Sequence, residues 1–171
     1  NGNEDQAVDA AESEAGVVLN SAGNYVWKKT IRSTRNQIMA IQPDMVTEER
    51  DSLAVALDTM LSYEGIMRKS AYMLQRGETI RSLLEGALSA CQVLDLSGCS
   101  LDAVLYYVDR DIPVLVMLQD GNAVLLIGFN EMNTVIMNPQ TGTIYKMGMN
   151  DSKTWFKENG NRFITYIRNE N

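Results

Sequence analysis

Residues 112–129 read IPVLVMLQDGNAVLLIGF, two apolar runs separated by the polar turn sequence QDGN. Short runs rich in valine, isoleucine and leucine that flank a turn of this kind are typical of a β-hairpin. Three more short runs follow, TVIM at 134–137, TIYKM at 143–147 and RFITYI at 162–167, with a helix expected to begin at Asp151 and end at Asn159-Gly160. We therefore predict an antiparallel meander in the second half of the chain.

The first half of the chain has helical periodicity instead. Apolar residues repeat at helical spacing in 48–64 and again in 78–90, and Ser100 is placed to cap a third helix with Asp102 in its first turn. Helices that precede a run of strands indicate the α+β class. We expect the helices to pack on the antiparallel sheet.

The N-terminal part of the chain carries two further signals. Residues 17–31, VVLNSAGNYVWKKTI, predict a β-hairpin ahead of the helices, because two β-rich runs flank a turn sequence. Residues 1–15, NGNEDQAVDAAESEA, lack an apolar core and predict an acidic flexible tail or linker. The remaining residues, 16–171, have a length that suits one domain.

The composition excludes several kinds of chemistry. The chain contains no histidine, so it lacks the usual general base of serine and cysteine hydrolases and the usual ligand of catalytic zinc. We expect no metal and no cofactor. The net charge of −7, with scattered basic residues, argues against a nucleic-acid partner, and the apolar runs are too short to span a membrane.

The two cysteines, Cys91 and Cys99, allow two interpretations. They form a disulfide if the chain is exported, or they are free and half-buried thiols. As a nucleophile, either cysteine would lack its customary imidazole partner. A residual cysteine hydrolase therefore stays a weak alternative.

The order of the elements, together with three motifs, resembles the C39-like family of papain-like cysteine peptidases over about residues 42–167. The motifs are Gln42 ahead of the first long helix, Gly121-Asn122-Ala123-Val124 at the start of a core strand, and the Asn138-Pro139 turn after the next strand. The resemblance implies a papain-like α+β fold.

The resemblance also implies where the catalytic residues would stand. In the family, a glutamine supplies the oxyanion hole six residues before a nucleophilic cysteine at the helix start, a histidine is the base, and an asparagine or aspartate orients it. The corresponding residues here are Gln42, Glu48, Asn122 and Asn138. Since an amide cannot accept a proton and Glu48 is no thiol, the resemblance implies a degenerate, non-catalytic pseudo-peptidase.

Each of these four residues also has an ordinary structural interpretation. Glu48 fits a carboxylate stabilised at a helix start, and Asn122 and Asn138 lie in turn sequence, where asparagine is common. Gln42 stands before Pro43 in a polar loop.

We expect a non-catalytic domain that binds a peptide or protein segment, or another domain of the same protein, through these four residues. The full-length protein would be an exported or envelope-anchored, extracytoplasmic bacterial protein. A purely structural or assembly module with a closed cleft is the alternative from another class.

Overall fold

The computed structural model describes residues 37–169 of the chain. The acidic tail and the hairpin predicted at 17–31 lie outside the described residues. The helices are α3 (Ser52–Tyr63), α4 (Ser70–Gln75), α5 (Ile80–Ala87), α6 (Leu101–Val108) and α7 (Met149–Glu158). The strands are β1 (Gln37–Ile38), β2 (Cys91–Asp95), β3 (Val114–Met117), β4 (Ala123–Phe129), β5 (Asn133–Asn138), β6 (Thr143–Gly148) and β7 (Arg162–Arg168).

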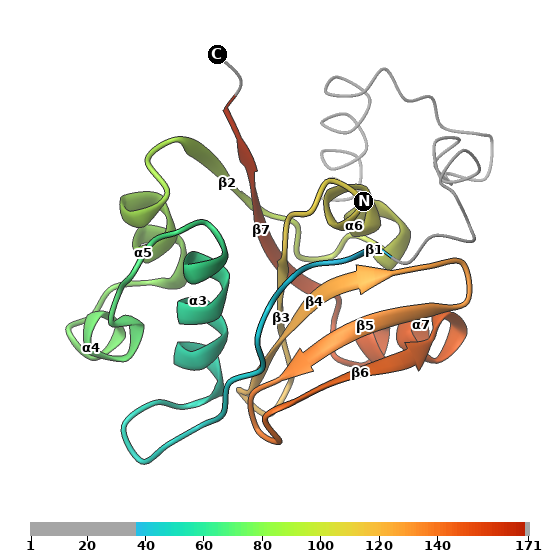
Figure 1. The fold of residues 1–171 in the computed structure, drawn as a ribbon, viewed down its shortest axis with the longest axis horizontal. Helices are drawn as coiled ribbons and strands as arrows, with labels where there is room; N and C mark the ends of the chain where they lie inside the picture. The colour runs from blue at the N-terminus through green and yellow to red at the C-terminus, as the bar shows by residue number, and fades with distance from the viewer. Residues whose placement is uncertain (1–36, 170–171) are drawn as a thin grey trace.

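The strands form one antiparallel sheet in the order β2-β7-β3-β4-β5-β6. The two-residue β1 pairs with the end of β4, beyond the reach of β3. The meander predicted from β3 to β6 is confirmed, and the last strand, β7, returns to lie between β3 and β2. Helices α3, α4 and α5 gather on one side of the molecule, as Figure 1 shows. The α+β class is confirmed.

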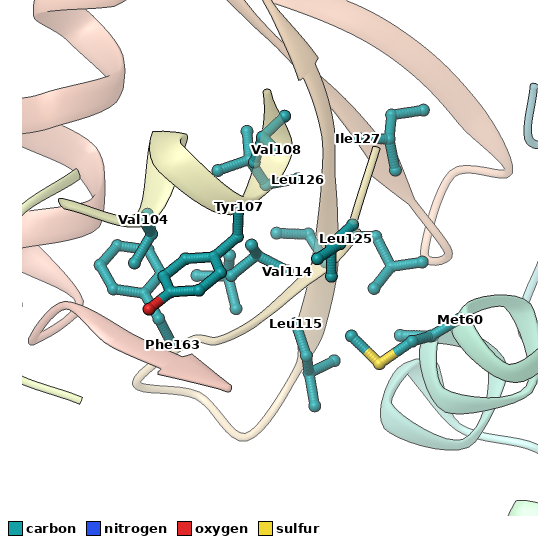
Figure 2. Packing of buried hydrophobic residues seen from close by; sticks show 14 of the residues in the cluster. Met60, Val104, Tyr107, Val108, Val114, Leu115, Leu125, Leu126, Ile127 and Phe163 are labelled. Atoms are coloured by element: carbon teal, nitrogen blue, oxygen red, sulfur yellow. The ribbon is translucent and has the colours of Figure 1, made fainter. Parts of the chain in front are cut away.

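The centre of the sheet is covered on both faces. Every residue of β3 and β4 is buried, which is the pattern of strands enclosed from both sides. Figure 2 shows Met60 of α3 and Tyr107 of α6 on opposite sides of these two strands. Both side chains are fully buried. Helix α3 is thereby packed firmly against the strand whose first residues form the candidate site.

The first long helix begins later than the sequence suggested. We expected it to start at Glu48, but it starts at Ser52, because the Asp51 side chain caps it by accepting a hydrogen bond from Ala54 N. The Thr47 hydroxyl accepts from two backbone N–H groups within the preceding turn instead. Glu48 therefore lies in an exposed turn outside the helix.

Other boundaries also differ from expectation. The helix expected over 78–90 is the shorter α5, which Thr79 and Ser82 begin with a reciprocal capping box. The segment after it, expected as a loop between the cysteines, is strand β2 paired with β7. Helix α4 was not predicted. Its first backbone N–H is held by the Asp58 side chain of α3 at 3.0 Å.

The C-terminal end of α3 is fixed to the last strand. The Glu64 carboxylate accepts hydrogen bonds from Arg168 Nε at 3.1 Å and Nη2 at 2.6 Å, and from the Tyr166 hydroxyl at 2.6 Å. Burial by itself would raise the pKa of Glu64, but the bonds from Arg168 and Tyr166 and the charge of Arg168 lower it.

A search for membrane-spanning segments within residues 37–169 finds no helix with the length and apolar character needed to cross a bilayer.

Candidate functional site

Two residues 70 positions apart meet at the start of α3. The Ser52 hydroxyl donates a hydrogen bond to Asn122 Oδ1 at 2.8 Å and accepts one from the backbone N–H of Ala123 at 3.0 Å. Ser52 is only 1% exposed. The buried Ser52 hydroxyl therefore uses its hydrogen in one bond and accepts another through its oxygen.

Asn122 is also engaged on its other side. The exposed Asp120 carboxylate accepts a hydrogen bond from the backbone N–H of Asn122 at 3.0 Å, and the Asn122 side chain is a second hydrogen-bond partner. These two bonds hold the pKa of Asp120 below its ordinary value. The network Ser52–Asn122–Asp120 thus satisfies its own polar groups.

Asn138 stands at the same end of the sheet, at the close of the neighbouring strand β5. Its Oδ1 accepts from Gln140 N at 3.0 Å, and its side chain also hydrogen-bonds to Tyr145. Burial raises the pKa of Tyr145, and the bond to Asn138 partly opposes this. The side-chain bonds of Asn138 go to Gln140 and Tyr145, so Ser52, Asn122 and Asn138 lie at one end of the sheet without forming one hydrogen-bonded chain.

The remaining two sequence candidates lie apart from this network. Gln42 is exposed and lines a cavity beside α3, whereas Glu48 is exposed in the turn before α3 and is not among the cavity residues. The structure therefore brings Asn122 together with Ser52, which sequence reasoning missed, and leaves Glu48 four positions before the helix start.

The cavity has a volume of about 570 Å³. Its walls come from the segment between β1 and α3, from the outward side of α3 and from the connection between α3 and α4. The lining residues are Ala40, Ile41, Gln42, Pro43, Asp44, Arg50, Asp58, Thr59, Ser62, Tyr63, Ile66, Met67 and Arg68. A volume of this order is typical of ligand sites.

Arg50 organises the charges in the cavity wall. Its Nη2 lies 3.1 Å from Asp44 Oδ2 and 3.2 Å from Asp58 Oδ2, so one guanidinium joins the loop to α3. Asp58 also holds the first N–H of α4. The wall is thereby cross-linked by partly buried ion pairs. Arg68, which also lines the cavity, donates to the neighbouring carbonyl of Met67 and makes no ion pair within residues 37–169.

The loop between Gln42 and Ser52 also contacts the turn after Asn138. Val46 N donates to the Pro139 carbonyl at 3.0 Å. Gly142 has a φ of +65°, and a Cβ added there would stand 3.1 Å from Met45 Cβ, so the loop approaches the turn closely only because this residue is glycine. The loop therefore rests on the strand end where Asn138 lies.

Both cysteines are free thiols. Cys91 is the first residue of strand β2, and Cys99 lies four positions beyond its last residue, Asp95. Cys99 is fully buried. Burial, followed by the nearby charge of Glu64, raises the pKa of the Cys91 thiol. Among residues 37–169, no group of three or more histidine, cysteine, aspartate or glutamate side chains is arranged to hold a metal ion.

Solved structures share this architecture. A protein from Bacillus anthracis described as a C39-like peptidase superposes with a TM-score of 0.65 at 16% identity, over 80% of this chain and 100% of that chain. The chain has the fold of the C39-like peptidases. No protein-family model matches the sequence, and no curated protein matches it either.

Two further structures share the C39-like fold. One is a double glycine motif protease from an AMS/PCAT transporter in complex with the leader peptide, with a TM-score of 0.58 at 15% identity, over 77% of this chain and 94% of that chain. The other is the peptidase domain of Streptococcus ComA, a bifunctional ABC transporter involved in quorum sensing, with a TM-score of 0.52 at 12% identity, over 76% and 99%. At these identities the similarity establishes the fold alone.

A local signal for Ser52 was present in the sequence. Asp51-Ser52 stands directly before LAVALDTML, and an aspartate in front of such a run is a strong helix N-cap. Thr47 and Asp44 offered competing caps, and the six-residue spacing from Gln42 favoured the earlier start. The spacing from Gln42 to the helix is ten residues instead, because the loop that contacts Pro139 is inserted between them.

Proposed function

We propose that this domain does not hydrolyse peptides and binds a peptide or protein segment in the cavity beside Gln42. One observation carries the proposal: Ser52, at the first position of the first long helix, donates its hydroxyl hydrogen bond to the amide oxygen of Asn122. Asn122 cannot accept that proton as a base would, and the chain contains no histidine. We accordingly assign the degenerate nucleophile position to Ser52 in place of Glu48, and the degenerate base position to Asn122.

The cavity supports the binding part of the proposal. It combines apolar surface from residues such as Ile41 and Ile66 with hydrogen-bonding groups such as Gln42, a mixture that suits a peptide. One protein of the same fold, the double glycine motif protease, has been solved with a leader peptide bound. In this proposal Gln42 contributes directly to the cavity, while Asn122 and Asn138 maintain the strand ends next to it and Glu48 has no role in binding.

The cellular setting is part of the proposal. We propose that the full-length protein is a larger exported or envelope-anchored protein of a bacterium, in which the bound segment belongs to a partner or to another domain. Two proteins of the same fold belong to transporters, one of which is described as a bifunctional ABC transporter. The free thiols of Cys91 and Cys99 add no support for an oxidising compartment, so fractionation of the native protein is the direct measurement.

One observation favours the purely structural alternative. The hydrogen bond from Val46 to Pro139 and the contact of Met45 with Gly142 place the loop against the strand ends, which is the arrangement expected of a closed cleft. The remaining alternative, hydrolysis by Cys91 or Cys99, conflicts with the burial of Cys99 and the raised pKa of Cys91.

The test is selection from a phage-displayed library of random linear peptides, followed by affinity measurement on synthetic copies of the enriched peptides. We expect enriched peptides that bind the wild-type domain and are not cleaved, as judged by mass spectrometry. Ser62→Trp, which fills the cavity from an exposed position of α3, should weaken binding by about tenfold or more. Thr154→Trp, on the exposed face of α7, is the matched control.

Three outcomes would overturn the proposal. Absence of enriched peptides, or equal binding by the Ser62→Trp and wild-type domains, would favour the structural module. Cleavage of an enriched peptide that Cys91→Ser or Cys99→Ser abolishes would establish the hydrolase instead. Circular dichroism of each variant excludes misfolding as the cause.

A further inference from the structure

The surface next to the cavity is basic, although the chain as a whole is acidic. Residues 66–76, IMRKSAYMLQR, contain three basic side chains and no acidic one, while the whole chain has 15 basic and 22 acidic residues. We call the exposed side chains Met67, Arg68, Lys69, Tyr72 and Arg76 the α4 surface. They lie on the connection to α4 and on α4 itself, at the outer edge of the molecule (Figure 1).

The α4 surface includes two large, exposed side chains with apolar area. Met67 is 81% exposed and Tyr72 is 56% exposed, which makes them two of the five large apolar residues that are exposed within residues 37–169. Methionine and tyrosine are enriched at protein interfaces, and the flexible methionine side chain adapts to different partners. Charged residues around such side chains give an interface its specificity.

The positive charges of this surface are available to a ligand. Arg68 and Lys69 make no ion pair within residues 37–169, whereas Arg81 nearby is paired with Glu85 at 3.2 Å. Arg76 lies 5.4 Å from the centroid of the Tyr72 ring and donates from Nη1 to the Tyr72 hydroxyl at 2.9 Å. The tyrosine and the guanidinium are therefore held together as one exposed unit.

The α4 surface is continuous with the cavity and fixed relative to it. Met67 and Arg68 belong to both the surface and the cavity wall. The Asp58 carboxylate holds Ser70 N at 3.0 Å and Arg50 at 3.2 Å, which ties the start of α4 to α3 and to the loop. Within the cavity wall the two carboxylates of Asp44 and Asp58 already pair with the single guanidinium of Arg50, so the positive charge without an ion pair lies on the α4 side.

We propose that the segment bound in the cavity is acidic and extends onto the α4 surface, where its carboxylates meet Arg68, Lys69 and Arg76 and its apolar side chains contact Met67 and Tyr72. This inference rests on the proposed function, because it names the chemistry of the ligand for the same cavity. Charge complementarity selects the ligand: three basic groups with exposed apolar neighbours match a peptide of alternating acidic and apolar residues.

The test uses the phage-displayed peptide library with three proteins: the wild type, Arg68→Glu/Lys69→Glu, and Lys146→Glu/Lys157→Glu. The last variant is the control, because it makes the same change in net charge at exposed positions of β6 and α7. We expect peptides enriched on the wild type to be rich in aspartate and glutamate. Their affinity should fall by about tenfold or more for the α4 variant and by less than about twofold for the control.

Salt and apolar substitutions extend the test. Binding of an enriched peptide should weaken as salt is raised, and Met67→Ala/Tyr72→Ala should weaken it without altering the salt dependence. Peptides that bind and lose affinity with Ser62→Trp, but have no acidic bias and tolerate Arg68→Glu/Lys69→Glu, would overturn this inference and leave the proposed function intact. Binding of the α4 surface to vesicles containing phosphatidylglycerol, but not to acidic peptides, would overturn it in favour of a membrane surface.

Discussion

At the scale of single residues, the Ser52 hydroxyl joins α3 to the start of β4 through two hydrogen bonds, so its removal should lower stability. Ser52→Ala leaves Ala123 N–H, which belongs to a fully buried residue, without its partner and deprives Asn122 Oδ1 of its donor. We expect a loss of about 1–3 kcal/mol in the free energy of unfolding, measured by urea denaturation.

A control variant and a double variant show whether the loss comes from the contact between Ser52 and Asn122. Ser62→Ala, at an exposed position of the same helix, should change stability by less than about 0.5 kcal/mol. The double variant Ser52→Ala/Asn122→Ala should lose less than the sum of the single variants, because both remove one shared hydrogen bond. Equal effects of Ser52→Ala and Ser62→Ala would show that the contact with Asn122 contributes nothing to stability.

The thiols give a second prediction at this scale. Because burial and the charge of Glu64 raise the pKa of Cys91, and Cys99 is fully buried, both should react with iodoacetamide at pH 7 more slowly than a free peptide thiol. In urea both should react at the ordinary rate, as counted by intact mass. Rapid modification of the folded protein at neutral pH would instead support the hypothesis of a cysteine hydrolase.

At the scale of elements, the bond between the end of α3 and strand β7 predicts a pH dependence. The pKa of Glu64 is lower in the folded chain than its ordinary value, so its stabilising contribution is fully present above that ordinary value. The contribution is lost as the pH falls through the lowered, folded-state pKa. Glu64→Gln should therefore cost about 1–3 kcal/mol at neutral pH, a range reduced because the Arg168 side chain is 41% exposed.

The difference in stability between wild type and Glu64→Gln should shrink as the solution is acidified below the ordinary carboxyl pKa. Glu85→Gln is the matched control, because it breaks the exposed pair with Arg81 and should cost less than about 0.5 kcal/mol at every pH. A difference for Glu64→Gln that stays constant down to strongly acidic pH would mean that packing, and not charge, is what the substitution removes.

Elements with strong local signals were predicted correctly. Strand β4 has the bounds 123–129 that its apolar run predicted, and Ser100 caps α6 as expected. Elements that depend on distant contacts were missed. Helix α4 is six residues long and is anchored by Asp58, twelve positions away, while β2 becomes a strand by pairing with β7 about 70 positions later. Neither contact leaves a periodic trace in the local sequence.

The residues of the candidate site also fall into those that a local sequence signal predicted and those that depend on distant contacts. Asn122 was identified because its motif, the turn and the apolar strand after it, is local. Its partner Ser52 was missed because the contact spans 70 positions and the loop before α3 is longer than the spacing from Gln42 suggested. The cavity depends on how three separate segments pack, so the sequence supplied only Gln42 from its wall.

At the scale of the whole molecule, charge is distributed unevenly. The chain has a net charge of −7, yet residues 66–76 carry only basic ionisable groups apart from Tyr72. A uniformly acidic surface would repel an acidic ligand from every direction. The α4 surface therefore supplies the local attraction that would orient such a ligand towards the cavity.

The helices and the sheet share one hydrophobic core, so we expect them to unfold together. One buried cluster contains Met60 from α3, which covers one face of the central strands, and Leu105 from α6, which covers the other. Because α3 and α6 pack on the same two strands, loss of either helix uncovers apolar residues of β3 and β4. The described residues should then behave as one cooperative unit, in keeping with the single domain predicted for residues 16–171.

Met60→Ala and Leu105→Ala test this unity, since each removes a fully buried side chain from a different face of the sheet. Each should lower the free energy of unfolding by about 2–5 kcal/mol. Each should also shift far-ultraviolet and near-ultraviolet circular dichroism transitions by the same amount, because a two-state transition has one midpoint for all probes. A substitution that moves one transition and leaves a second in place would show that the helical half and the sheet are separate folding units.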